Sequence, residues 1–258
     1  MTLDFTGRTA LFVGGPGALC AALADQLAER GAAVFTDVIG DGRPAPAAIA
    51  ETGQLDILVI NGEVAAGPAR SAVLAESVGV DLGSRLGLVA RALDLALPRM
   101  RGKGYGRVLS IASAAGAFGS AADPAGAALA GALQALIKSL AAGHLGADLC
   151  INTLSPLVDS AMTAAFFEAI PTLDGSCFDT EAPLALAIHL CHEACAVTGE
   201  SFSAGAGRFA RIFQATAPGL FQPGLGEEQI EANLAAIMDP EGYIVPRDAP
   251  DELVLVAV

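Results

Sequence analysis

Apolar and polar stretches alternate along this chain as they do in proteins that interleave buried strands with helices. The first unit begins at residues 6–17, an apolar run that breaks into glycines. Residues 18–30 follow, with Leu19, Leu23 and Leu27 at helical spacing. The pattern predicts a strand, a tight turn and a helix.

The same alternation continues to about residue 205. We expect further strands at residues 32–37, 56–61, 107–113, 149–154 and 197–205, and helices at residues 84–100, 124–145 and 183–196. Strands that alternate with helices pair in parallel and are covered on both faces. The sequence therefore predicts an α/β fold with a Rossmann-like, doubly wound parallel sheet.

The end of the chain differs in composition. Residues 218–258 carry eight acidic side chains and one basic one, Arg247. We expect residues 1–217 to form one domain and residues 218–258 an acidic extension with a helix at residues 227–238. The apolar residues 253–258 are predicted to pack on a neighbouring subunit, with a solvated terminus as the alternative.

Charge and hydropathy narrow the classes of function. The net charge of −14 argues against binding to nucleic acid or to anionic membranes. Positive mean hydropathy without any Trp suits a protein that buries surface in an oligomer. The apolar residues 9–24 are broken by Pro16 and Gly17 and preceded by Asp4, so we predict no transmembrane segment and a cytoplasmic location.

The cysteines indicate reduced thiols rather than a disulfide framework. They number five, an odd count, and have no framework spacing. His189, Cys191, His192 and Cys195 form the one cluster with metal-binding residue types. His189 and Cys191 lie on nearly opposite sides of the predicted helix, so we expect no metal site.

Two motifs give the pattern a family resemblance. Ser113-Ala114-Ala115-Gly116 follows the strand at residues 107–113, and Ile151-Asn152-Thr153-Leu154-Ser155-Pro156 occupies the next strand. With the glycine-rich turn, these resemble the short-chain dehydrogenases/reductases from about residue 6 to residue 213. Residues 190–200 and the Gly205-Ala206-Gly207-Arg208 segment are similar to the branch that oxidises 3-hydroxyacyl-CoA and related substrates.

The resemblance implies a nicotinamide dinucleotide site, but its residues are degraded here. The family's three turn glycines fall on Gly14, Ala18 and Cys20, so that Gly14, Gly15 and Gly17 are vestigial. Asp37 stands where an acid binds the ribose 2′-hydroxyl, or it is an ordinary strand-end aspartate.

Three further positions weaken the same site. Asn61 remains from the family's Asn-Asn-Ala-Gly motif, but Glu63 brings a carboxylate towards the position of an anionic cofactor. Leu157 replaces the glycine that passes close to the nicotinamide. Residues 38–55 are too few for the helix, strand and helix that the family places there, which need about 30 residues. We therefore expect this chain to bind no dinucleotide.

The family's catalytic tyrosine, lysine and asparagine are also replaced by other residues in this chain. With Ser113 as the family's serine, the tyrosine position is Gly126, the lysine position is Ala130 and the asparagine position is Asp81. The family's lysine lowers the pKa of the tyrosine from its ordinary value of about 10, and both side chains are missing.

No other tyrosine or lysine is placed to substitute. Tyr105 lies at the opposite end of its strand from Ser113, and Lys138 lies two helical turns beyond Ala130. Tyr243, in the extension, stays open as a residue that completes a site, its own or a neighbour's.

Losses confined to the cofactor and catalytic positions, with an intact scaffold, indicate a non-catalytic subunit. We expect a hetero-oligomer with an active family member, formed through helices at residues 84–100 and 126–145, in which the partner binds NAD and oxidises an alcohol or a 3-hydroxyacyl-CoA. Two alternatives remain open. One is an enzyme of different chemistry that uses Ser113, Asp81 and Asp123, and the other is a regulator that binds acyl-CoA or a nucleotide.

Overall fold

The structure is a computed structural model that describes residues 3–15, 17–37, 53–62, 74–121, 123–158 and 178–256. For residue 37, residues 74–82 and residues 255–256 it describes the backbone alone. Residues Met1–Ile212 and Phe213–Val258 form two compact units.

The first unit is built on a seven-stranded sheet in the order β2-β1-β3-β4-β5-β6-β7. Its strands are β1 (Thr9–Val13), β2 (Ala33–Asp37), β3 (Ile57–Asn61), β4 (Gly106–Ile111), β5 (Leu149–Pro156), β6 (Ser201–Gly205) and β7 (Arg208–Ile212). All neighbours pair in parallel except β6 and β7. The prediction of a Rossmann-like α/β fold is confirmed.

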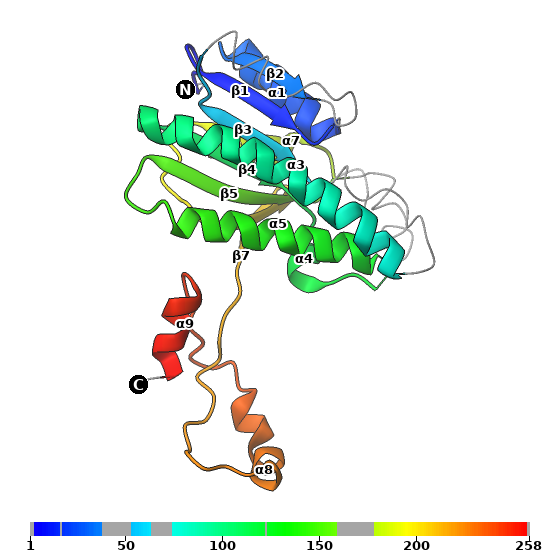
Figure 1. Cartoon of the computed structure of the whole chain (residues 1–258), viewed down its shortest axis with the longest axis vertical. Helices are drawn as coiled ribbons and strands as arrows, with labels where there is room; N and C mark the ends of the chain where they lie inside the picture. The colour runs from blue at the N-terminus through cyan, green and yellow to red at the C-terminus, as the bar shows by residue number, and fades with distance from the viewer. Residues whose placement is uncertain are drawn as a thin grey trace. The chain divides into compact units, whose positions relative to one another are not determined.

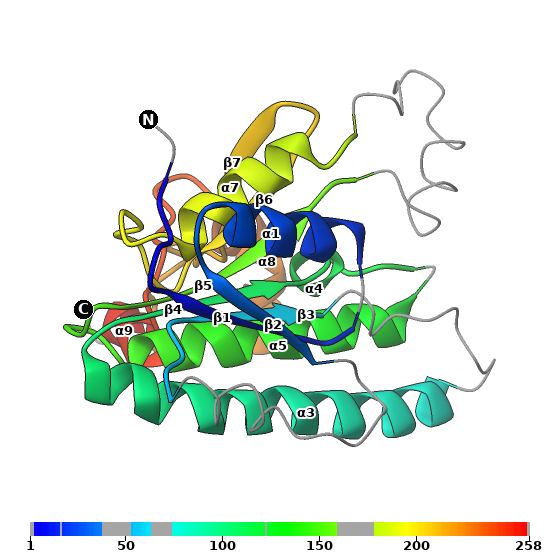
Figure 2. The same cartoon turned by 90° about the horizontal axis from the view of Figure 1, so that it is seen from above.

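Helices cover both faces of this sheet (Figures 1 and 2). One face carries α1 (Ala18–Glu29) and α7 (Glu181–Cys191), and the other carries α3 (Leu74–Lys103) and α5 (Pro124–Ala142). A short helix, α4 (Ala115–Phe118), follows β4 and lies against α5. The two faces bury separate apolar clusters, as expected for a sheet between two helix layers.

The position of helix α5 is determined by capping residues at its start and by the apolar residues that it buries against the sheet. Its N-cap residue Asp123 accepts a hydrogen bond from the Gly126 N–H, and Pro124 occupies the first turn. Leu129, Leu133 and Ile137 are buried against the sheet. Among the described helices, α5 alone is long and apolar enough to cross a membrane, a test that the core helix of a soluble protein also passes.

Two predicted elements are shorter than expected. Helix α7 ends at Cys191 rather than at residue 196, and β6 begins at Ser201 rather than at residue 197. The Asn152 side chain explains the second difference, because its Nδ2 donates to the Val197 carbonyl at 2.8 Å and its Oδ1 accepts from the Glu200 N–H at 3.1 Å. These bonds hold residues 197–200 as a loop against β5.

Two other elements exceed the prediction. Helix α3 extends from Leu74 to Lys103 and carries Pro98 in its interior. Strand β7 was not predicted, and it forms a hairpin with β6 through Ala206 and Gly207, whose φ angles are 48° and 72°. Two central residues with positive φ are typical of the tight turns that join hairpin strands.

The second unit contains two helices, α8 (Glu227–Ile237) and α9 (Ala249–Val256). Thr216 and Ile244 form a backbone bridge, and the rings of Phe213 and Tyr243 stack with centroids 5.8 Å apart. None of the side chains described between residues 213 and 254 is buried.

Candidate functional site: the vestigial cofactor and catalytic positions

Most of the predicted site residues meet at one edge of the sheet. Strand register pairs Val13 with both Asp37 and Ile60, and Ile60 with Ser110. The carboxyl ends of parallel strands are where open α/β sheets bind ligands. The glycine turn, Asn61 and Ser113 therefore lie along the edge that the family uses.

The glycine turn keeps its backbone shape but is bound by a side chain of the protein. Gly14 and Gly15 have φ angles of 109° and 88°, which glycine adopts without strain. Asn61 Nδ2 donates to the Gly15 carbonyl at 3.1 Å. A Cβ at Gly17 would lie 2.9 Å from the same nitrogen, so the Asn61 amide occupies the space beside this glycine.

The first turn of α1 retains the free backbone N–H groups of an anion site but lacks the family's later glycines. Its N-cap residue, Gly17, makes no side-chain cap, so the helix N-terminus still presents backbone N–H groups. Ala18 is exposed there, in place of a family glycine, and Cys20 is 7% exposed and packs in the core.

Ser113 is engaged in local structure. Its hydroxyl accepts a hydrogen bond from the Ala115 N–H at 3.2 Å, at the start of α4. Its carbonyl accepts from Gln134 Nε2 of α5 at 3.0 Å. These bonds tie the end of β4 to α4 and α5.

The tyrosine position serves a helix cap. The Gly126 N–H donates to Asp123 Oδ1 at 2.9 Å, and the Asp123 N–H donates to the Ser120 hydroxyl at 3.2 Å. A Cβ at Gly126 would lie 2.8 Å from the Asp123 carboxyl carbon. Any larger residue at position 126 therefore displaces the capping carboxylate.

The lysine position is covered by α4. Ala130 is 6% exposed, and a Cβ at Gly116 would lie 2.6 Å from both the Ala130 carbonyl carbon and the Gly131 nitrogen. A Cβ at Gly131 would in turn lie 3.1 Å from the Gly116 carbonyl oxygen. The two helices thus meet backbone to backbone beside Ala130.

Other predicted positions give less information. Glu63, Cys177 and residues 38–52 lie outside the described residues, as do the side chains of Asp37 and Asp81. Leu157 packs against Gly205, where an added Cβ would lie 2.6 Å from the Leu157 Cβ, and its own side chain is 38% exposed.

The remaining tyrosines and lysines lie away from Ser113. Tyr105 precedes β4, at the end opposite to Ser113, and the guanidinium groups of Arg8 and Arg107 lie 3.8 and 4.5 Å from the centre of its ring. Burial raises the pKa of Tyr105 above its usual 10.0, although both arginines act against this. Lys138 lies on α5 two turns beyond Ala130, and Tyr243 belongs to the second unit.

No group of three or more metal-binding side chains occurs among the described residues. The predicted cluster is divided: His189 is exposed on α7, Cys191 and Cys195 are buried in the core, and the His192 ring packs edge-on against Phe5 at 5.1 Å.

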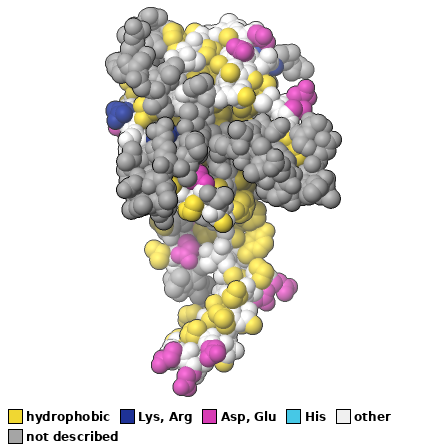
Figure 3. All heavy atoms as spheres, turned by 90° about the vertical axis from the view of Figure 1, so that its right-hand side faces the viewer, with side chains coloured by type: hydrophobic (Ala, Val, Ile, Leu, Met, Phe, Trp, Pro, Cys, Tyr) yellow, Lys and Arg dark blue, Asp and Glu magenta, His cyan; other side chains and the backbone are white. Residues whose placement is uncertain are grey.

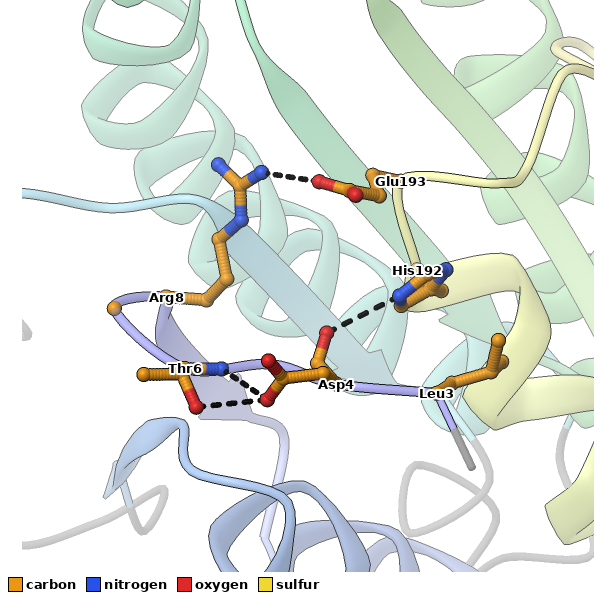
Figure 4. Close-up of a pocket in the computed structure, with 7 residues that line it drawn as sticks. Leu3, Asp4, Thr6, Arg8, His192 and Glu193 are labelled. Atoms are coloured by element: carbon orange, nitrogen blue, oxygen red, sulfur yellow. Dashed lines mark hydrogen bonds and ion pairs between the residues drawn. The ribbon is translucent and has the colours of Figure 1, made fainter. Parts of the chain in front are cut away.

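A separate pocket of about 530 Å³ lies at the opposite, amino-terminal edge of the sheet (Figure 4). Its polar groups are paired with one another: Arg8 with Glu193 at 2.7 Å, and His192 Nε2 with the Asp4 carbonyl at 3.1 Å. The hydroxyl and then the N–H of Thr6 lower the pKa of Asp4 below its usual 3.8. Because these groups already satisfy each other, the pocket adds no reactive group to the site.

The comparisons with known proteins agree with this geometry. The solved structure of full-length peroxisomal multifunctional enzyme type 2 from Drosophila melanogaster has a TM-score of 0.72 with 19% identity, over 99% of this chain and 49% of that one. A short chain dehydrogenase from Mycobacterium avium has a TM-score of 0.68 with 20% identity, over 93% and 98%. The chain has the short-chain dehydrogenase/reductase fold.

Two more sequence-similar proteins link this chain to short-chain oxidoreductases. The 3-oxoacyl (acyl-carrier-protein) reductase from Agrobacterium tumefaciens, solved with NADP bound, has a TM-score of 0.63 with 27% identity over 80% of this chain and 96% of its own. Peroxisomal multifunctional enzyme A from Dictyostelium discoideum is 28% identical over 154 residues, 60% of this chain and 34% of that protein. The chain thus spans about a third of this relative's length. No protein-family profile matches the chain.

The residues do not fit the cofactor that a short-chain dehydrogenase/reductase uses for catalysis. Asn61 occupies the space beside Gly17, and Gly126 and Ala130 carry no group that could transfer a proton. We therefore assign no hydride or proton transfer to these residues.

Sequence reasoning did not predict the contacts that Gly116, Asp123 and Gln134 make, and it named Asp123 only as a candidate catalytic residue. Of these, Asp123 had a signal, because Asp followed by Pro is typical of a helix start. Gly116 and Gln134 had none, since their partners Ala130, Gly131 and Ser113 lie 14 to 21 residues away.

Proposed function

We propose that this chain is a non-catalytic subunit of a heteromeric, NAD-dependent short-chain hydroxyacyl-CoA dehydrogenase. The observation that carries the proposal is the use of the catalytic positions for packing. The Gly126 N–H binds the Asp123 cap, and Ala130 packs beside Gly116 of α4, so neither position carries a hydroxyl or an ammonium group that could transfer a proton. In this proposal the active partner binds NAD and this chain binds none.

The substrate class rests on the relatives. One solved neighbour is named for a 3-oxoacyl group on an acyl-carrier protein, and two other relatives are peroxisomal multifunctional enzymes, so we propose an acyl thioester as the substrate class. The pattern of losses resembles the degenerate subunit of 2-(hydroxybenzyl)succinyl-CoA dehydrogenase in anaerobic toluene degradation. We extend the proposal to that kind of complex, in aromatic or acyl-CoA catabolism.

Helix α5 supports association with a partner. Its side facing away from the sheet carries small residues that are exposed or half-buried, Ala128, Ala132 and Ala135 among them. A surface of small side chains permits another helix to approach closely. We therefore place the partner on α3 and α5, within residues 84–100 and 126–145.

The second unit supports the same proposal. Large apolar side chains are exposed throughout it, among them Phe221 at 79%, Met238 at 68% and Leu253 at 64%. Figure 3 shows hydrophobic and acidic side chains next to one another on its surface. A unit of this size with no buried side chain among those described lacks a core of its own, so we propose that a neighbouring subunit covers it.

The alternative of a different enzyme receives less support. Two of its three candidate residues are engaged in local structure: the Ser113 hydroxyl accepts from the Ala115 N–H, and Asp123 caps α5. The alternative of a nucleotide binder keeps one favourable observation, the uncapped N-terminus of α1 beside the glycine turn. Binding measurements separate it from the leading proposal.

The first test is isothermal titration of the purified chain with NAD, NADH and NADP, with an active short-chain dehydrogenase as the positive control. We expect no binding tighter than about 1 mM, which corresponds to about −4 kcal/mol. Micromolar affinity for any of the three would contradict the proposal and favour the nucleotide binder.

The second test is co-expression with a short-chain dehydrogenase encoded beside this chain. We expect the two to purify together, with activity dependent on the partner's tyrosine. Ala135→Arg, on the exposed side of α5, should release the partner, whereas Ala28→Arg, at an exposed position of α1 on the other face, should not. Equal retention by both variants would remove α5 from the interface.

A further inference from the structure

The buried thiols of this protein lie together. Cys20, Cys150, Cys191 and Cys195 all belong to the apolar cluster on the α1 and α7 face of the sheet, and none of them is in a disulfide. Cys150 comes from β5, and Cys195 from the loop that joins α7 to β6. The chain brings these two residues into contact across 45 positions.

Cys150 and Cys195 are connected by hydrogen bonds. The Cys150 thiol donates to the Cys195 carbonyl at 3.2 Å, and the two side chains also share a hydrogen bond. Asn152 lies beside them, with its Nδ2 3.8 Å from Cys195 Sγ. The same Nδ2 donates to the Val197 carbonyl, so the loop that carries Cys195 is held against β5, the strand that carries Cys150.

The surroundings make the two thiols unequal. The hydrogen bond from Cys150 lowers the pKa of Cys195 from its usual 9.0 to about 6, against the effect of burial. The Val197 backbone, Arg107 of β4 and His189 of α7 act in the same direction as this bond. The same hydrogen bond, followed by burial and with a small contribution from Asp148, raises the pKa of Cys150. Burial likewise raises the pKa of Cys191.

Cys195 lies just below the surface. Its side chain is 2% exposed, but the adjacent residues Ala194 and Ala196 are exposed and Val197 is 40% exposed. A local opening of this short loop exposes the sulfur without disturbing the sheet. Cys191, by contrast, is enclosed at the end of helix α7.

We propose that Cys150 and Cys195 form a redox-active dithiol that a hydroperoxide converts into a disulfide. The Cys195 thiolate attacks the peroxide, the O–O bond breaks, and the leaving oxygen takes a proton to become water or an alcohol. Cys150 then attacks the sulfur of the Cys195 sulfenic acid, the S–S bond forms and the second oxygen leaves as water. The two thiols lose two electrons and the peroxide gains them.

The expected consequence is a fixed connection between β5 and the loop before β6. The bond would replace the Cys150 hydrogen bond to the loop with a covalent link across residues 150–195. A loop of this length loses chain entropy in the unfolded state when it is closed, so the oxidised protein should be the more stable form. This site does not depend on the proposed subunit function.

Peptide mapping under non-reducing conditions tests the proposal, with the full chain treated with hydrogen peroxide in a Cys177→Ser background. We expect a cross-link between the Cys150 and Cys195 peptides with the loss of two hydrogen atoms. Cys150→Ser should leave a sulfenic acid at Cys195 that dimedone traps, and Cys195→Ser should abolish the reaction. Cys20→Ser and Cys191→Ser are the matched controls and should leave the cross-link unchanged.

The pH profile gives a readout that does not depend on the variants. Because the pKa of Cys195 is about 6, the oxidation rate should stay level from pH 9 to pH 7 and fall below pH 6. At pH 7 a larger fraction of Cys195 should be thiolate than of a thiol with the usual pKa of 9.0 held in the same loop, but a thiolate of lower pKa is also less nucleophilic, so we expect Cys195 to react only a few-fold faster. Oxidation of Cys20 or Cys191 ahead of Cys195, a cross-link that forms only in denaturant, or a rate that still rises above pH 8 would each overturn the proposal.

Discussion

Gly126 lies in the first turn of α5, where its N–H binds Asp123 Oδ1 at 2.9 Å. Ala130 lies one turn later, 6% exposed beneath the backbone of Gly116. At both positions a small residue lets a neighbouring group come close. Both small residues thus serve capping and packing contacts in this structure.

Restoring the catalytic side chains should therefore fail. We expect the double variant Gly126→Tyr with Ala130→Lys to show no alcohol oxidation with NAD, because the glycine turn also departs from the family's pattern, at Ala18 and Cys20. The buried lysine should lower the free energy of unfolding by about 2 kcal/mol or more. Ala135→Lys, at an exposed position of the same helix, is the control and should change it by less than about 0.5 kcal/mol. Urea unfolding measures the change in stability, and a turnover assay with NAD measures alcohol oxidation. Measurable turnover would contradict the interpretation of the site as non-catalytic.

Thr153 carries a different residue-scale prediction. It is 1% exposed, and its hydroxyl has no hydrogen-bond partner within the described part of the chain. An unpaired buried hydroxyl costs about 1–3 kcal/mol, and valine has nearly the same shape. We expect Thr153→Val to raise the free energy of unfolding by about 1 kcal/mol and Thr153→Ser, which keeps the hydroxyl, to lower it. Chemical denaturation measures both, and a destabilising Thr153→Val would point to a partner for the hydroxyl.

At the scale of elements, the contact between α4 and α5 determines whether the old site stays filled. Gly116 faces Ala130 and Gly131, and their backbones leave no room for a methyl group. Ser113 and Gln134 add a hydrogen bond between the same segments. The two helices therefore close the edge of the sheet as one unit.

Gly116→Ala tests this contact. Its Cβ would lie 2.6 Å from backbone atoms, so a helix must move, and we expect a loss of about 1–3 kcal/mol. Gly83→Ala, on α3 with no atom within 4 Å of the added Cβ, is the control. The free energy of unfolding of this control variant should rise by up to about 1 kcal/mol, because alanine has a higher helix propensity than glycine. Thermal unfolding of the two variants compares them, and equal effects would refute a tight contact between α4 and α5.

At the scale of the whole molecule, the two units differ in how they bury apolar surface. Residues Met1–Ile212 enclose two apolar clusters, whereas no described side chain from residue 213 to residue 254 is buried. The second unit also carries about half of the net negative charge, with eight acidic residues and Arg247. These properties suit a segment that completes its packing on another chain.

Removal of residues 216–258 tests that role. We expect the shortened chain to keep the helix content of residues Met1–Ile212 and to keep its unfolding midpoint within about 3 °C, because it loses no described buried side chain. Its complex with the active partner should weaken at least about tenfold, since the exposed apolar surface of the second unit is lost. Sedimentation of the mixed chains measures this, and unchanged association would show that the second unit is not part of the interface.

The sequence by itself determined the order and type of most elements and the loss of the catalytic side chains. Apolar spacing is a local property, so it placed α1, α5 and the buried strands, and counting from Ser113 placed Gly126 and Ala130. The limits of an element were predicted less accurately where they depend on residues distant in the sequence. The ends of α7 and β6 depend on Asn152.

Only the tertiary structure decided what fills the old site and which thiols meet. Asn61 against Gly15, Gly116 against Ala130, and Cys150 against Cys195 are contacts between residues 14 to 46 positions apart. No local pattern encodes such a contact, because it arises when the sheet and its helix layers bring separate segments together. Strand β7 and its hairpin with β6 belong with them, since the residues of β7 alternate too weakly in burial to be recognised as a strand from the sequence.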